Sequence, residues 1–133
     1  MARVLIVEDD PLMLRLYQKA FSFEGYDVDI AGDGAEGLKK ARESKPTLII
    51  LDIMMPRMNG LEFLDSLKVI PEIKTIPVVV LTNLAGDKDA ETALMKGAVK
   101  YIVKSQHDPK EVVAMVKEIL LGYTREEIPS AVN

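Results

Sequence analysis

The fold is decided by the stretch VLIVEDD at residues 4–10, in which four apolar residues precede three acidic ones. A continuously apolar run of this length is typical of a strand that helices cover on both faces of a parallel sheet. The acidic residues follow at the carboxyl end of the expected strand, where doubly wound sheets place their working groups. The stretch therefore predicts a buried first strand with a polar site at its end.

Four further runs of β-branched and other apolar residues alternate with longer amphipathic stretches. They cover residues 28–30, 48–51, 78–81 and 101–103. This alternation predicts five βα units on one parallel sheet, and the polar-apolar pattern of residues 27–30 predicts that the second strand lies at an edge. The predicted fold class is α/β, a flavodoxin-like doubly wound (βα)5 fold with strand order 2-1-3-4-5 and helices on both faces.

Helices are expected near residues 11–24, 34–43, 60–69, 87–96 and 109–121. Asp10 and Asp108 each precede a proline and are interpreted as N-caps of the first and last helices. Gly25, Gly97 and Gly122 lie where helices should end. The small, polar residues at the start of the fourth helix predict that it is the least firmly packed.

The composition limits the functions that the chain can serve. Its 133 residues, 48% hydrophobic and 29% charged, suffice for one sizeable core and are too few for two ordinary domains. A net charge of −4 argues against direct binding to nucleic acid or anionic membranes. The chain has no cysteine and one histidine, His107, which argues against thiol catalysis and the common zinc sites. We therefore expect one soluble globular unit.

Polar residues follow four of the five expected strands. Glu8 and Asp9 follow the first strand, Asp52 the third, Thr82 the fourth and Lys104 the fifth. Because the carboxyl ends of parallel strands meet at one edge of the sheet, these side chains should converge. Carboxylates at close range repel one another and require a cation. A set of hard oxygen ligands at a solvent-open edge favours Mg²⁺.

Asp52 in this setting is a candidate nucleophile toward phosphorus. A carboxylate can form an aspartyl phosphate while a metal ion and Lys104 neutralise charge on the phosphoryl oxygens. Thr82 would hydrogen-bond a phosphoryl oxygen, and its inward movement would vacate space that Tyr101 can fill. Each residue alone has an ordinary structural explanation, such as a strand-end charge for Lys104. The combination favours chemistry.

Five separated segments together resemble the receiver domain of CheY-like response regulators in two-component signalling. They are VLIVEDD at 4–10, LDIMMP at 51–56 with Asn59 and Gly60, LT at 81–82, Tyr101 and Lys104. All five in this order and at these separations make the resemblance specific. It covers residues 1–122 as a receiver domain and leaves residues 123–133 as a C-terminal tail or linker stub.

The resemblance implies a phosphoryl transfer to Asp52 from a histidine kinase or a histidine phosphotransfer protein. It implies a Mg²⁺ ion held by Glu8, Asp9, Asp52 and the main-chain carbonyl of Met54. Thr82 and Lys104 would assist the transfer. Thr82 and Tyr101 would then switch the surface formed by the fourth helix, the fifth strand and the fifth helix, where such receivers recognise partners.

The expected function is that of a stand-alone response regulator in the cytoplasm, which is not an enzyme in the ordinary sense. The sequence does not identify its downstream protein partner, nor does it decide whether phosphorylation drives dimerisation. The first alternative is a receiver from a larger regulator with a DNA-binding or enzymatic output domain. The second is a nucleotide or flavin binder on the same fold, which is disfavoured because an acidic loop replaces the glycine-rich phosphate loop.

Four positions depart from the usual receiver pattern. Ser105 follows Lys104 where receivers commonly have a proline, often after a cis peptide bond, and Asn83 follows Thr82 where a small residue is usual. Met54 and Leu84 are apolar where polar side chains in such receivers position the hydrolytic water. We expect slow self-dephosphorylation from these two residues.

Overall fold

The computed structural model describes residues 2–126, with side chains through Gly122. Its centre is a parallel sheet with the strand order β2-β1-β3-β4-β5, which confirms the predicted topology and places the second strand at an edge. The strands are β1 (Arg3–Val7), β2 (Asp27–Ala31), β3 (Leu48–Leu51), β4 (Val78–Thr82) and β5 (Lys100–Val103).

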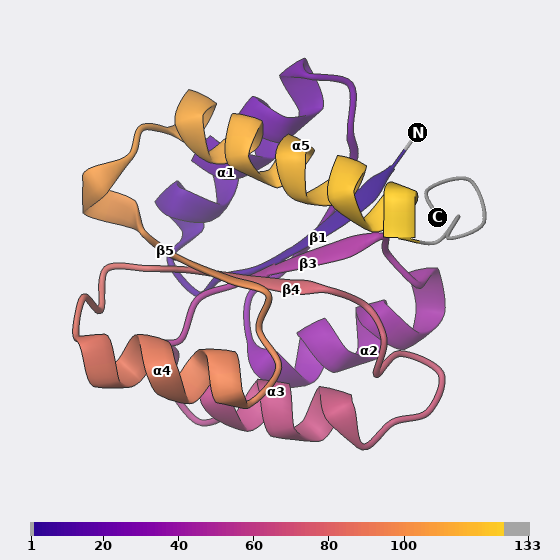
Figure 1. The fold of residues 1–133 in the computed structure, drawn as a ribbon, viewed down its shortest axis with the longest axis vertical. Coiled ribbons are helices and arrows are strands. Elements are labelled where there is room, and N and C mark those ends of the chain that lie inside the picture. Colours follow the sequence, from indigo (N-terminus) through magenta and orange to yellow (C-terminus); the bar gives the residue numbers. More distant parts are fainter. Residues whose placement is uncertain (1, 127–133) are drawn as a thin grey trace.

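Helices cover both faces of the sheet, as predicted for a doubly wound fold. Figure 1 shows α1 and α5 on one face and α2, α3 and α4 on the other. A hydrophobic cluster fills the space on each side, one around Phe21 and Val116 and the other around Phe63 and Leu67. The helices are α1 (Pro11–Phe23), α2 (Gly34–Ser44), α3 (Gly60–Lys68), α4 (Asp87–Met95) and α5 (Pro109–Glu126), with the short 3-10 helix η1 (Lys104–Gln106) before α5.

Local capping explains most helix boundaries. The Asp10 side chain accepts a hydrogen bond of 2.9 Å from the Leu12 N–H, which confirms its predicted role as the N-cap of α1. Gly25 and Gly97 have positive φ angles of 91° and 106°, the backbone conformation that ends a helix. Gly122 does not adopt this conformation, and α5 continues to Glu126. The predicted end of the last helix at residue 121 is therefore wrong.

The C-terminal segment that was predicted as a tail or linker stub begins inside this longer helix. Residues 123–126 belong to α5, and residues 127–133 lie outside the described part of the chain. Within residues 2–126, no helix combines the length and apolar character needed to cross a bilayer.

The helix predicted to be least firmly packed buries little. Among its nine residues, α4 buries only the Ala93 side chain, and its N-cap, Gly86, offers no side-chain hydrogen bond. Leu94 and Met95 are 47% and 88% exposed. A helix with so few buried apolar contacts opens at low cost.

Candidate functional site

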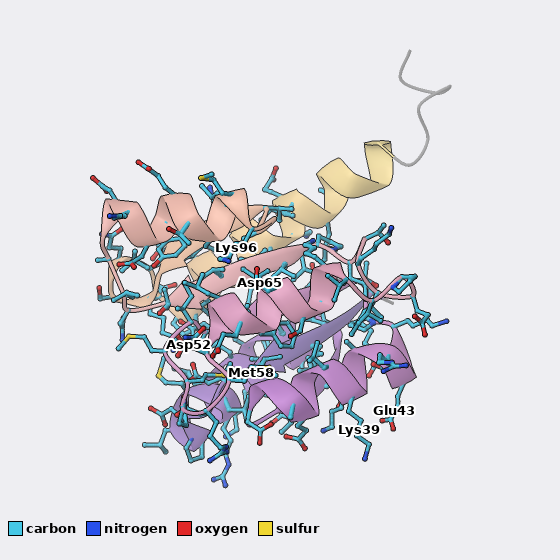
Figure 2. The ribbon with its side chains drawn as sticks, turned by 90° about the horizontal axis from the view of Figure 1, so that it is seen from below. Lys39, Glu43, Asp52, Met58, Asp65 and Lys96 are labelled. Carbon is cyan, nitrogen blue, oxygen red and sulfur yellow. The ribbon has the colours of Figure 1, made fainter. Side chains whose placement is uncertain are left out.

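Strand register brings the predicted site residues to one edge of the sheet. Val7 of β1 pairs with Leu51 of β3, so that Glu8 and Asp52, the next residues along, follow two neighbouring strands. Thr82 of β4 pairs with Val103 of β5, which places Lys104 directly after that pair. Figure 2 shows Asp52 beside the loop that leads into α3.

The three predicted carboxylates form one cluster. Ligand oxygens of Glu8, Asp9 and Asp52 lie within 4.8 Å of one another. The Glu8 and Asp52 side chains are buried, whereas Asp9 is exposed to solvent. The cluster therefore has a closed inner side and an open outer side, which suits an ion that keeps part of its water shell.

Lys104 joins the two buried carboxylates. Its Nζ donates a hydrogen bond to Glu8 Oε1 and lies 3.2 Å from Asp52 Oδ2. The Lys104 side chain is itself only 7% exposed. The prediction gave Lys104 a role toward phosphoryl oxygens but did not foresee its ion pair with Glu8.

Main-chain N–H groups hold the remaining carboxylate oxygens. The Met54 N–H donates to Asp52 Oδ1 over 3.1 Å, and the Asp10 N–H donates to Glu8 Oε2 over the same distance. Both buried carboxylates are thus bonded through each of their oxygens. This fixes their orientation before any ligand arrives.

Burial and charge alter the proton affinities of the site. Burial raises the pKa of Glu8 to about 7, and the nearby Asp52 charge adds to the rise, while the hydrogen bond from Lys104 opposes it. Burial acts to lower the pKa of Lys104, but its hydrogen bond to Glu8 and the charge of Asp52 raise it above its usual value. The lysine therefore stays cationic.

Gly60 supports the Asp52 loop in a way that sequence reasoning missed. A Cβ on Gly60 would lie 2.6 Å from both the main-chain oxygen of Asp52 and the Cα of Ile53. The Gly60 N–H also donates to the Ile53 carbonyl over 2.9 Å. Asn59 caps α3 in a reciprocal capping box with Glu62. The Asn-Gly pair followed by Glu62 was the available signal for this helix start.

The predicted switch residues are linked through one main-chain residue. Thr82 is fully buried, and its Oγ1 accepts a hydrogen bond of 3.3 Å from the Leu84 N–H. The Tyr101 hydroxyl donates to the Leu84 carbonyl. The loop after β4 is therefore connected to both Thr82 and Tyr101.

The structure also locates Ser105 and Asn83, the two residues that depart from the receiver pattern directly after Lys104 and Thr82. Lys104 and Ser105 belong to the 3-10 helix η1, and no peptide bond among the described residues is cis. Asn83 is exposed beside the buried Thr82.

Comparisons with known proteins agree with this geometry. The family model described as the response regulator receiver domain matches residues 4–117. This chain belongs to the response regulator receiver family. The receiver shares 32% identity and a TM-score of 0.85 with a CheY-like receiver domain from Methanospirillum hungatei, over 95% of this chain and 98% of that one. It shares 29% identity and a TM-score of 0.83 with CheY4 of Vibrio cholerae, over 89% and 98%.

Curated relatives include two regulators with longer chains. The receiver is 36% identical over 115 residues to the DNA-binding response regulator MtrA of Mycolicibacterium smegmatis, covering 86% of this chain and 49% of that protein. It is 38% identical over 118 residues to the alkaline phosphatase synthesis transcriptional regulatory protein PhoP of Bacillus subtilis, covering 89% and 48%. The chain thus spans about half the length of these relatives.

The family assignment fixes the general character of the site. The receiver is a signalling domain of two-component response regulators, outside the ordinary enzyme families, and such domains partner with histidine kinases. Its acidic cluster is typical of a receiver Mg²⁺ site and is consistent with a phosphorylation site. The donor set fits Mg²⁺, because the three clustered residues supply only carboxylate oxygens.

Proposed function

We propose that this receiver is a switch that accepts a phosphoryl group on Asp52. The observation that carries the proposal is the setting of the Asp52 carboxylate. It is buried, held by Lys104 and the Met54 N–H, and within 4.8 Å of the oxygens of Glu8 and Asp9. A carboxylate oriented in this way beside fixed positive charge is prepared for attack on phosphorus.

The proposed step transfers a phosphoryl group from a phosphohistidine on a histidine kinase or a histidine phosphotransfer protein. An oxygen of the Asp52 carboxylate forms a bond to phosphorus while the bond from phosphorus to the donor's imidazole nitrogen breaks. The imidazole keeps the electron pair of that bond and takes up a proton. The product is an acyl phosphate on Asp52.

Lys104 and Thr82 have separate roles in this proposal. Lys104 forms ion pairs with Glu8 and Asp52 in the unphosphorylated receiver. Once the acyl phosphate forms, its ammonium group also binds the phosphoryl oxygens. The Thr82 hydroxyl donates a hydrogen bond to a phosphoryl oxygen. Thr82 Oγ1 also accepts a hydrogen bond from the Leu84 N–H, so that a movement of Thr82 toward the phosphoryl group shifts the loop after β4 as well.

The residues that would hold Mg²⁺ are Glu8, Asp9, Asp52 and the main-chain carbonyl of Met54. The bound ion supplies neutralisation of charge on the phosphoryl oxygens. Glu8 and Asp9 supply the counter-charge that keeps the ion at the edge of the sheet. The buried Glu8 is also held by Lys104, so that the pocket keeps its shape before the ion enters.

The output surface in this proposal comprises α4, β5 and α5. Phosphorylation pulls Thr82 inward, and Tyr101 follows as its bond to the Leu84 carbonyl is rearranged. The weak packing of α4 lets this surface adopt two arrangements. The surface then recognises a downstream protein partner or a second copy of the receiver, without direct contact to nucleic acid or membrane.

A second candidate places the receiver in a longer regulator. It is favoured by the observation that the chain matches about half the length of relatives described as DNA-binding or transcriptional regulators. The phosphorylation chemistry is the same in both cases. In either form we propose that the protein works in the cytoplasm, where its phosphodonor domains act.

The test of the proposal is the intact mass of the protein after incubation with acetyl phosphate and Mg²⁺. We expect the mass to rise by one phosphoryl group. The rise should not occur in Asp52→Asn or when EDTA removes the metal. If acetyl phosphate and histidine-kinase donors both fail to add a phosphoryl group, the proposal is wrong.

A further inference from the structure

An apolar groove lies between α1 and α5, apart from the acidic site. It has a volume of about 670 Å³ and is lined by residues from the second half of α1 and the first half of α5. Figure 1 shows these two helices beside one another on the same face of the sheet. None of the acidic-site residues lines the groove. The lining includes Leu16, Lys19, Phe23 and Glu24 on the α1 side and Lys110, Ala114 and Lys117 on α5.

The α1 side of the groove exposes large apolar side chains. Leu16 is 45% exposed and Phe23 is 86% exposed, although both belong to a helix that already buries Tyr17 and Phe21 in the core. A surface helix normally has one apolar stripe and a polar opposite face. Leu16, Ala20 and Phe23, at i, i+4 and i+7, form a second apolar stripe on α1 that lines the groove, and its two large side chains remain exposed.

Positive charge surrounds the apolar floor. Lys19, Lys110 and Lys117 line the groove, and Glu24 is the single carboxylate among the lining residues. All three lysines are exposed, and none of them takes part in an ion pair within the part of the chain that the structure describes. This positive rim contrasts with the net charge of −4 of the whole chain.

We infer that the groove between α1 and α5 binds an amphipathic helix of a partner protein, one that carries an apolar ridge flanked by carboxylates. The concave apolar floor receives the ridge, and Lys19, Lys110 and Lys117 pair with the flanking carboxylates. A lipid surface fits less well, because its acyl chains cover a flat or convex apolar face better than a groove between two helices. The interaction lies outside the proposed phosphorylation chemistry.

The probe is a panel of synthetic helical peptides of about 16 residues, with Leu at i, i+3, i+4 and i+7 and Glu on either side of that ridge. Binding to the full chain is followed by fluorescence anisotropy, and the bound surface is mapped by NMR shifts of groove residues. A matched panel carries Lys in place of each Glu. We expect the acidic peptides to bind at least about tenfold more tightly than the basic ones.

Two protein variants test the groove itself. Lys19→Glu with Lys117→Glu should weaken binding of the acidic peptides at least about tenfold. The control, Lys39→Glu with Lys74→Glu, changes the net charge equally at exposed positions elsewhere and should leave binding within about twofold. Figure 2 shows Lys39 on the outer side of α2.

Ala114→Phe, which fills the groove without changing charge, should also weaken binding. Melting curves check that each variant folds.

Four results would overturn the inference. The first is that no acidic peptide binds in the panel, and the second is that the control pair weakens binding as much as the groove pair. The third is that phosphatidylserine vesicles bind at the groove while the peptides do not. The fourth is that sedimentation shows the receiver itself dimerising through the groove, with the dimer lost in Ala114→Phe.

Discussion

Gly60 lies so close to Asp52 that a Cβ on the glycine would stand 2.6 Å from the aspartate's main-chain oxygen. No flexible side chain can yield at this contact, because both sides are backbone. The start of α3 therefore presses directly on the loop that presents the proposed phosphoacceptor. Gly60, which has no side chain, thus sets the position of the proposed phosphoacceptor.

Gly60→Ala should destabilise the receiver by about 1 to 3 kcal/mol, because the backbone of the Asp52 loop must shift to admit a methyl group. The shift should also slow phosphorylation of Asp52. Urea unfolding and the rate of phosphoryl gain measure the two effects. Gly122→Ala is the matched control, since a Cβ there meets nothing within 4 Å and the helix should gain up to about 1 kcal/mol. Equal effects of the two substitutions would contradict the account.

Lys104→Met should destabilise the metal-free receiver by about 3 kcal/mol. It removes the cation that pairs with the buried carboxylates of Glu8 and Asp52. Added Mg²⁺ should restore more stability to this variant than to the parent chain. Thermal melts with Mg²⁺ and with EDTA measure both effects.

The control for this substitution is Lys96→Met. Lys96 pairs with Asp65 between α4 and α3, and Figure 2 shows the two residues near one another. This pair is exposed, so that its loss should cost less than about 1 kcal/mol and should not respond to Mg²⁺. If both lysine variants melt alike, Lys104 does not have the structural role assigned to it.

Met54→Asn with Leu84→Glu should speed loss of the phosphoryl group by at least roughly tenfold, because the new polar side chains can orient the attacking water. The Met54 side chain is apolar and 56% exposed, so that it offers no polar group that could orient a water at the site. The half-life of the phosphorylated protein, read from intact mass, is the measurement. Met54→Leu with Leu84→Met keeps both positions apolar and should leave the half-life unchanged. An unaltered half-life in the polar pair would refute this explanation.

Phosphorylation should change hydrogen exchange in α4 more than in α2. The reason is that α4 buries only Ala93, and the loop before it is bonded to both Thr82 and Tyr101. Tyr101→Phe removes the bond to the Leu84 carbonyl and should cost about 1 kcal/mol while leaving phosphorylation of Asp52 intact. In this variant the exchange of α4 should respond less to phosphorylation. Exchange in α4 that phosphorylation leaves untouched would contradict the switch.

The sequence was a good guide to the fold because hydrophobic periodicity governs it. Continuous apolar runs predicted the parallel sheet and one alternating run the edge position of β2, while the strand order followed from the flavodoxin-like fold class. The first four helices end within one residue of their predicted ends, since capping residues act locally. The end of α5 was missed because a glycine ends a helix only when its backbone turns left-handed, and Gly122 does not.

The site was partly predictable for the same reason. Acidic and basic residues that follow strands must share an edge of the sheet, so Glu8, Asp52 and Lys104 could be grouped in advance. The pairing of Lys104 with Glu8 joins residues 96 positions apart, and the contact of Gly60 with Asp52 depends on how α3 packs. Neither leaves a pattern in the chain, because both depend on tertiary distances.

The most direct test of the central claim locates the phosphoryl group itself. The receiver is phosphorylated with Mg²⁺ and a phosphodonor, and borohydride then reduces the acyl phosphate to an alcohol that survives proteolysis. Peptide mass spectrometry should find homoserine in place of Asp52, and only when Mg²⁺ was present. Reduction at Asp9 or at another carboxylate, or no reduced residue after treatment with a histidine-kinase donor, would contradict the assignment of Asp52.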